Sequence, residues 1–113
     1  IQTDLIPLGK TILLGFSQGG AMALEAGSAL PLAGMICCSA YPHPGWVPPE
    51  IMPPVVFTHG TNDEVVPFQA TVQIVDALKI HNNKVDFLKF EGGHEIPMNL
   101  FIEIKNSIRE WLI

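Results

Sequence analysis

Residues 10–21 of this 113-residue chain have the sequence KTILLGFSQGGA, and this stretch decides the fold class. The apolar run over residues 10–16 is short and bounded by glycine, which is typical of a buried strand. It leads into the pattern G-x-S-x-G at residues 15–19, which is typical of a sharp turn from a strand into a helix. We expect Gly15 and Gly19 to be required there, because side chains two positions from the serine would crowd so tight a turn.

Ser17 occupies the tip of this turn, where its hydroxyl would point away from the backbone at the positive end of the following helix. A glycine-rich turn without catalysis is the alternative interpretation, since the five-residue pattern also occurs by chance. Two partners follow in the chain: Asp63 in HGTNDEVVP (residues 59–67) and His94 in EGGHE (residues 91–95). The order serine, aspartate, histidine is that of one known lineage of triads. We therefore predict that these three residues form a catalytic triad.

The composition indicates one small domain with a large supply of apolar residues. Hydrophobic residues make up 48% of the chain and charged residues 15%, where about a quarter is usual. So small a charged fraction suggests that much of the chain is interior, as in a half-domain covered by another segment or in a chain that oligomerises. The net charge is −5 and the six basic residues are scattered, so we expect no nucleic-acid partner. No apolar stretch is long enough to predict a membrane span.

Cys37 and Cys38 adjoin each other in a predicted buried strand. Neighbouring strand residues point to opposite faces of a sheet, so these two are not expected to pair with each other. Buried free thiols are typical of a reducing compartment, and we therefore expect a cytoplasmic location. The four histidines show neither H-x-x-x-H spacing nor paired ligands, so no metal site is predicted.

Strands and helices alternate along the sequence. The expected strands are residues 10–16, 33–39, 55–59 and 84–90. The expected helices are residues 18–29, 67 to about 81, and 97 onward, with a turn at residues 82–83. Between the second and third strands, residues 40–54 hold six prolines and are expected to be neither helix nor sheet interior. This alternation predicts an α/β fold with a parallel sheet and right-handed crossovers.

The spacing of apolar residues also predicts which side chains pack inward. For the first helix they are Met22, Leu24, Ala26 and Leu30. For the second they are Phe68, Val72, Val75, Leu78 and Ile80, and for the last Phe101, Ile104, Ile108 and Trp111 or Leu112. In the fourth strand they are Val85, Phe87 and Phe90.

The candidate catalytic residues fall at the carboxyl ends of predicted strands, the edge at which open parallel sheets bind ligands. In acyl transfer His94 would take the Ser17 proton and return it to the leaving group, while Asp63 would hold the imidazole tautomer. The amide of Gln18, the residue after the nucleophile, would give one oxyanion donor. The alternatives are a surface role for His94 and a turn role for Asp63, with Glu64 competing for the carboxylate position.

Other residues near these motifs receive structural or pocket roles. His59 precedes a glycine at a strand end and is interpreted as structural. Tyr41 and Trp46, in the proline-rich segment, are either loop anchors or parts of an acyl-pocket wall. Val66 is a third candidate for that wall.

Three motifs together resemble the phospholipase/carboxylesterase family of α/β-hydrolases, whose best-known members are acyl-protein thioesterases and small bacterial carboxylesterases. The motifs are GFSQGGA (residues 15–21), HG with DEVVP (residues 59–60 and 63–67) and GGHEI (residues 92–96). The similarity runs through nearly all 113 residues. It implies Ser17, Asp63, His94 and Gln18 in the roles above, short-chain ester or thioester substrates, and no cofactor.

The resemblance also implies the C-terminal half of an α/β-hydrolase fold, with a four-stranded parallel sheet flanked by helices. Residues 1–113 are then a single partial domain, without the family's N-terminal strands or the His-Gly loop that gives the second oxyanion amide. Residues 1–7 are interpreted as the tail of an upstream helix or loop. The strand over residues 10–16 would be an open apolar edge, so we expect the chain to pair with that missing half or with a copy of itself.

Two other functions stay open on the sequence alone. One is a catalytically silent α/β-hydrolase-like module that acts by binding or assembly. The other is a different serine hydrolase of the same architecture, such as a dienelactone hydrolase-like enzyme, although those usually carry cysteine in place of Ser17.

Overall fold

Residues 6–80 and 84–113 are described by a computed structural model, in which four strands and three α-helices alternate as predicted. The strands are β1 (Ile12–Phe16), β2 (Gly34–Cys38), β3 (Val55–Gly60) and β4 (Val85–Phe90). The helices are α1 (Gln18–Gly27), α2 (Phe68–Ile80) and α3 (Phe101–Leu112), and 3₁₀ turns at Leu8–Lys10 and Met98–Leu100 precede β1 and α3. The expected turn at residues 82–83, the helix end near residue 81 and the character of residues 1–5 lie outside the described residues.

All neighbouring strands run parallel, in the order β1-β2-β3-β4. The register places Phe16 beside Cys38, Cys38 beside Thr58, and Gly60 beside Phe90. The carboxyl ends of all four strands therefore meet at one edge of the sheet. Every residue of β2 and β3 is buried, as expected for parallel strands that are covered on both faces. The predicted four-stranded parallel sheet flanked by helices is confirmed.

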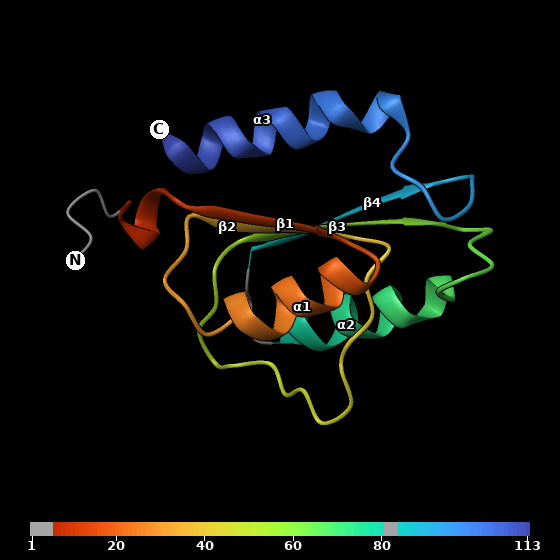
Figure 1. Ribbon diagram of the computed structural model, residues 1–113, viewed down its shortest axis with the longest axis horizontal. Helices are drawn as coiled ribbons and strands as arrows, with labels where there is room; N and C mark the ends of the chain where they lie inside the picture. Colours follow the sequence, from red (N-terminus) through yellow and green to blue (C-terminus); the bar gives the residue numbers. More distant parts are fainter. Residues whose placement is uncertain (1–5, 81–83) are drawn as a thin grey trace.

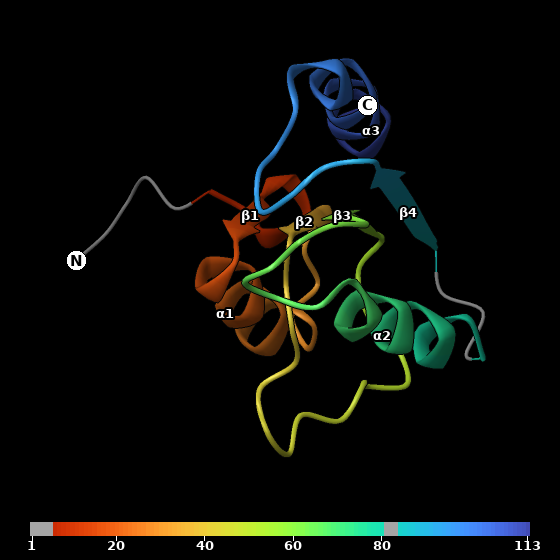
Figure 2. The same ribbon diagram turned by 90° about the vertical axis from the view of Figure 1, so that its right-hand side faces the viewer.

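Helices cover both faces of this sheet. α1 and α2 lie on one face and α3 alone lies on the other (Figure 1). The view turned by 90° places α1 on the β1 side and α2 on the β4 side of the shared face (Figure 2). Successive residues of β2 face the two layers in turn, since Met35 and Cys37 pack with α1 and α2, whereas Ile36 and Cys38 pack with α3.

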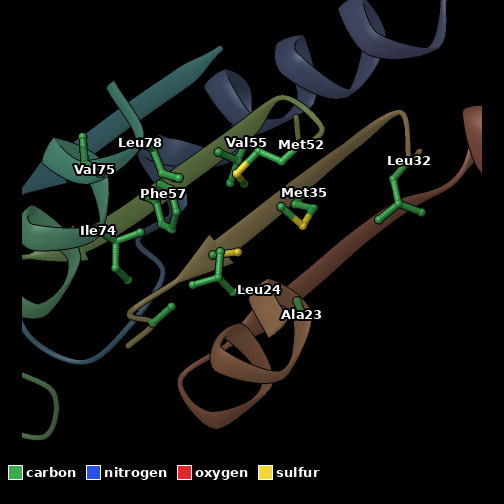
Figure 3. Close-up of a cluster of buried hydrophobic side chains, with 12 residues drawn as sticks. Ala23, Leu24, Leu32, Met35, Met52, Val55, Phe57, Ile74, Val75 and Leu78 are labelled. Atoms are coloured by element: carbon green, nitrogen blue, oxygen red, sulfur yellow. The ribbon is translucent and has the colours of Figure 1, made fainter. Parts of the chain in front are cut away.

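The larger part of the core lies between the sheet and the α1–α2 layer (Figure 3). It joins Leu24 of α1, Phe57 of β3 and Leu78 of α2, each at most 1% exposed. Met52 and Trp46, from the proline-rich segment of residues 40–54, also pack against this cluster. That segment therefore closes one side of the core without forming a helix or strand.

The packing face of α1 differs from the prediction. Met22 and Leu30 are 54% and 40% exposed, and Ala26 is exposed as well. The buried residues of α1 are Gly20, Ala21, Ala23, Leu24 and Gly27. A Cβ on Gly27 would lie 2.8 Å from Leu13 and 2.9 Å from Met35. Of the four predicted residues, Leu24 is buried as expected. The helix otherwise lies so close to the sheet that small residues form the contact, which apolar spacing alone does not predict.

On the other face, α3 packs through Ile104, Ile108 and Trp111. A Cβ on Gly34 would lie 2.2 Å from the Trp111 ring, so the glycine at the start of β2 makes room for the indole. Of the two alternatives at this end of the helix, Trp111 packs and Leu112 is 48% exposed. The predictions that Phe101 and Ile80 pack inward were wrong, because these side chains are 47% and 81% exposed.

Each outer strand lacks a neighbour on one side within the described part of the chain. The β4 edge carries exposed charges, Asp86 and Lys89, which protect an edge against pairing with another strand. β1 has the sequence ILLGF with no charge, and its Leu14 and Phe16 are 56% and 38% exposed. Among residues 6–80 and 84–113, no helix is both long and apolar enough to cross a membrane.

Candidate active site

Ser17 lies at the turn between β1 and α1. Its φ of 58° places it in the left-handed region, which residues with side chains adopt infrequently. Its carbonyl accepts a 3.0 Å hydrogen bond from the Ala21 amide, and its own amide donates to the Cys38 carbonyl at 2.7 Å. The turn is thus held by α1 on one side and β2 on the other, and this anchoring maintains the strained conformation.

Glycines allow α1 to begin directly against the strand. A Cβ on Gly15 would lie 2.1 Å from the Gly19 carbonyl oxygen, and one on Gly20 would lie 2.8 Å from the Ala40 Cβ. At Gly19 a Cβ would meet no described atom within 4 Å outside its own helical turn. The prediction of a steric requirement is therefore correct for Gly15 and wrong for Gly19 within the described residues.

Asp63 lies in the turn that follows β3, and its side chain is fully buried. The amides of Val65 and Val66 both donate to Oδ1, each at 2.8 Å, and Oδ2 faces His94. Burial alone would raise the pKa of Asp63, but hydrogen bonds from His94 and from the two amides outweigh it and hold the pKa below its usual value. The neighbouring Glu64 is exposed, so the fold brings Asp63 to the imidazole.

His94 bridges the other two residues from the loop after β4. Its Nδ1 lies 2.8 Å from Asp63 Oδ2, and its Nε2 lies 2.9 Å from Ser17 Oγ. Because an ionised carboxylate only accepts hydrogen bonds, Nδ1 carries the ring proton and Nε2 is the acceptor for the serine hydroxyl. The ring is 18% exposed and its centroid lies 4.7 Å from that of Phe16. The His94 ring therefore contacts Asp63, Ser17 and Phe16, and part of its surface remains exposed.

The His94 loop is brought into place by a glycine at the end of β3. A Cβ on Gly60 would lie 2.3 Å and 2.4 Å from the carbonyl oxygens of Gly92 and Gly93. The Asn62 amide also donates to the Gly92 carbonyl at 2.9 Å. The two loops that carry Asp63 and His94 are thus in backbone contact, which fixes the spacing between the carboxylate and the imidazole.

A cavity of about 480 Å³ opens beside Ser17. Its lining is Ser17, Gln18, Tyr41, Val65, Val66 and Pro67. Two of the three predicted pocket residues, Tyr41 and Val66, lie here. Trp46 does not: it lines a separate cavity with Pro48 and Ile74, and its Nε1 donates to Ser28 Oγ at 3.2 Å. Trp46 is placed as a loop anchor, the other role considered for it.

Gln18 is the first residue of α1 and borders the same cavity. The first amides of a helix have no partner within that helix, so the Gln18 amide is available to an oxygen atom bound beside Ser17.

Within the described ranges, no group of three or more histidine, cysteine, aspartate or glutamate side chains is arranged to hold a metal ion. Cys37 and Cys38 are free and buried. Burial is the main cause that raises the pKa of Cys37 to about 12, and the neighbouring Cys38 thiol adds to it.

Sequence reasoning missed two contacts of the site. Phe16 packs on the His94 ring, although its place in the G-x-S-x-G pattern accepts any residue. Thr71 of α2 bonds to the buried His59, which in turn lies 3.4 Å from Asp63 Oδ2. A signal existed in the four-residue spacing of His59 and Asp63, and in a threonine on the inward face of a helix.

A strand-to-helix turn that presents serine to a histidine and an aspartate, at the carboxyl edge of a parallel sheet between helices, defines an α/β-hydrolase fold. Solved structures agree. The chain is 30% identical to esterase PE8 with a TM-score of 0.84, covering 95% of this chain and 53% of that one. It is 27% identical to SOBER1 of Arabidopsis thaliana with a TM-score of 0.78, covering 96% and 56%.

The model of the phospholipase/carboxylesterase family matches residues 1–112, and the chain belongs to this family. A curated relative is acyl-protein thioesterase 1 of Neurospora crassa, 31% identical over 118 aligned positions that cover 95% of this chain and 48% of the relative. The chain therefore spans about half the length of the curated relative and of the solved structures that it matches.

Proposed function

We propose that this chain carries the catalytic half of a serine hydrolase that cleaves short-chain carboxylic esters or thioesters. The observation that supports this most directly is the continuous contact from Ser17 Oγ through His94 to Asp63, with distances of 2.9 Å and 2.8 Å. A serine hydroxyl is a weak nucleophile at neutral pH and needs a base within hydrogen-bond reach. His94 Nε2 lies within that reach of Ser17 Oγ, and membership in the phospholipase/carboxylesterase family supports ester hydrolysis as the reaction class.

In the proposed reaction Ser17 Oγ attacks the acyl carbonyl carbon while His94 Nε2 takes the hydroxyl proton. The tetrahedral intermediate then expels the alcohol or thiol, which receives that proton from His94, and an acyl-enzyme remains on Ser17. Water activated by the same imidazole releases the carboxylic acid. Asp63 stabilises the imidazolium in both steps, and the Gln18 amide donates to the oxyanion; a donor of this kind typically contributes about 100–1,000-fold in rate.

The substrate class is proposed from the cavity and from the relatives. The cavity beside Ser17 is lined by Val65, Val66, Pro67 and Tyr41, a surface suited to a short apolar acyl chain. One relative is named as a thioesterase and one solved structure as an esterase. We propose no cofactor, since acyl transfer by a serine triad needs none. A cytoplasmic location is proposed because both cysteines are free and buried.

The test is hydrolysis of p-nitrophenyl acetate and p-nitrophenyl butyrate by the purified chain, beside Ser17→Ala. Ser17→Ala removes only the nucleophile, so we expect turnover to vanish while the fold is retained. Covalent labelling by a fluorophosphonate probe, which reacts with activated serines, is read on the same two proteins. A matching butyryl thioester separates thioesterase from esterase activity.

A folded chain whose Ser17 neither turns over substrate nor takes the probe, alone or together with the N-terminal half that its relatives carry, would contradict the proposal. That result would favour the silent binding or assembly module. Turnover that survives in Ser17→Ala would contradict the acyl-enzyme mechanism instead, because the nucleophile would then be another group.

A further inference from the structure

His59 is buried at the end of β3 and lies beside Asp63 of the proposed triad. Its ring is fully buried, and its Nε2 lies 2.8 Å from the Val66 carbonyl oxygen and 3.4 Å from Asp63 Oδ2. Its Nδ1 lies 2.7 Å from Thr71 Oγ1, which also lies 3.1 Å from the Ala40 carbonyl oxygen. A chain of polar contacts thus runs from Ala40, in the segment after β2, through Thr71 of α2 and His59 to the Asp63 carboxylate.

The proton on Nε2 can be assigned from these partners. A carbonyl oxygen only accepts hydrogen bonds, so the short contact with Val66 requires a proton on Nε2. The single hydroxyl proton of Thr71 serves either the Ala40 carbonyl or Nδ1. In both arrangements Nε2 remains protonated, and this proton also faces Asp63 Oδ2.

Both oxygens of the Asp63 carboxylate therefore have polar partners. Oδ1 accepts from the amides of Val65 and Val66. Oδ2 accepts from His94 at 2.8 Å and faces His59 Nε2 at 3.4 Å. The same His59 proton bonds to the carbonyl of Val66, so one imidazole holds both ends of the Asp63–Val66 turn.

Aromatic packing closes the space around His59. The Phe68 ring lies edge-on to it at 5.8 Å between centroids, and Phe87 stacks on Phe68 at 5.5 Å. In such an apolar enclosure a hydrogen bond is electrostatically stronger than in water, and an unpartnered polar group is correspondingly costly. His59 is therefore fixed by its contacts in one orientation.

We propose that His59 is a positioning residue for the triad: its Nε2–H holds the Asp63–Val66 turn so that Oδ2 meets His94, and Thr71 fixes the ring. This inference rests on the proposed function and adds a residue to it. His59 touches neither substrate nor nucleophile and acts through Asp63.

The first test uses the unmodified chain and no substrate. Nitrogen-15 labelling of histidine and long-range proton–nitrogen correlation assign the protons on each ring. We expect His59 to carry a slowly exchanging proton on Nε2. A His59 ring protonated on Nδ1 alone would overturn the proposal, whatever the activity of the chain.

The second test compares Thr71→Val, which has the same shape without the hydroxyl, with Thr71→Ser, which keeps it. Because small displacements at a catalytic site cost up to about 100-fold in rate, we expect Thr71→Val to slow fluorophosphonate labelling of Ser17 by tenfold or more. It should also broaden or shift the downfield resonance of the His94 Nδ1 proton. Thr71→Ser should restore both.

The outcomes separate three cases. A lower unfolding midpoint in Thr71→Val, with labelling rate and resonance unchanged, would mean that Thr71 and His59 only stabilise the fold and would overturn the proposal. Failure of the unmodified chain to label, alone or together with the N-terminal half that its relatives carry, would contradict the proposed function, while the two resonance measurements would still decide the role of His59. Should Thr71→Val fail to fold, the tautomer of His59 in the unmodified chain remains decisive.

Discussion

At the scale of single residues, the Asp63 carboxylate carries the clearest electrostatic consequence. Hydrogen bonds from His94, Val66 and Val65 lower its pKa below the ordinary value of 3.8 despite burial. The folded state therefore favours the ionised form more than the unfolded state does. Asp63 contributes this stability in full above the ordinary pKa, and the contribution is lost as pH falls through the lowered pKa of the folded state.

We expect Asp63→Asn to be less stable than the unmodified chain at neutral pH and to lose less of its stability on acidification from about pH 6 to about pH 2. Denaturant unfolding curves across this range measure both effects. Asp76→Asn is the matched control, because Asp76 is exposed on α2. Equal acid sensitivity of Asp63→Asn and the unmodified chain would contradict the assignment.

The sequence predicted which residues meet at the candidate site better than it predicted their surroundings. Ser17, Asp63 and His94 follow strands in a fixed chain order, and the parallel sheet brings these positions to one edge. The sequence left Trp46 open between loop anchor and pocket wall, because its location depends on the path of a proline-rich segment that has no periodicity. Thr71 was missed because its contact with His59 joins two elements, α2 and β3, and depends on how these elements pack together.

At the scale of elements, the contact between β1 and α1 sets the geometry of the turn. Gly15 has no room for a side chain, since its Cβ would lie 2.1 Å from the Gly19 carbonyl oxygen, whereas Gly19 has open space. The two glycines of the same motif therefore have different physical roles. The first is a steric requirement for helix and strand to touch, and the second lies in the exposed first turn of the helix.

We expect Gly15→Ala to destabilise the chain by about 3 kcal/mol, the upper part of the usual range for overpacking, because the clash is with backbone. Gly19→Ala should change stability by less than about 1 kcal/mol, since alanine is the better helix former. Chemical denaturation of both variants measures the difference. Equal effects of the two substitutions would show that the close approach at Gly15 is not maintained in solution.

The strands and helices were predicted correctly from their apolar sequence patterns. The prediction failed for the packing face of α1, which depends on how closely the helix approaches the sheet. The buried strands β2 and β3 are continuous apolar runs, and they were found together with the two partly exposed outer strands. Apart from Leu24, the buried face of α1 was mispredicted because large apolar residues were expected inside. Gly20 and Gly27 lie at the closest approach to the sheet and its neighbouring loop instead, and glycine contributes nothing to an apolar pattern.

At the scale of the whole molecule, the two edges of the sheet are unequal. The β4 edge carries Asp86 and Lys89, and charged side chains of this kind oppose pairing with a further strand. The β1 edge has only apolar residues and glycine, with Leu14 more than half exposed. An apolar strand with unpaired backbone groups is a template for another strand, so β1 is the surface through which we propose that this chain associates.

We expect the purified chain to self-associate in a concentration-dependent way, and Leu14→Lys to shift it toward the monomer because the charge would be buried at a paired edge. Ile80→Lys is the matched control, since Ile80 is 81% exposed at the end of α2, the helix that lies on the β4 side of the sheet (Figure 2). Light scattering coupled to gel filtration measures the mass of each. A monomer at all concentrations would contradict the association, and an equal shift by both variants would place the contact elsewhere than β1.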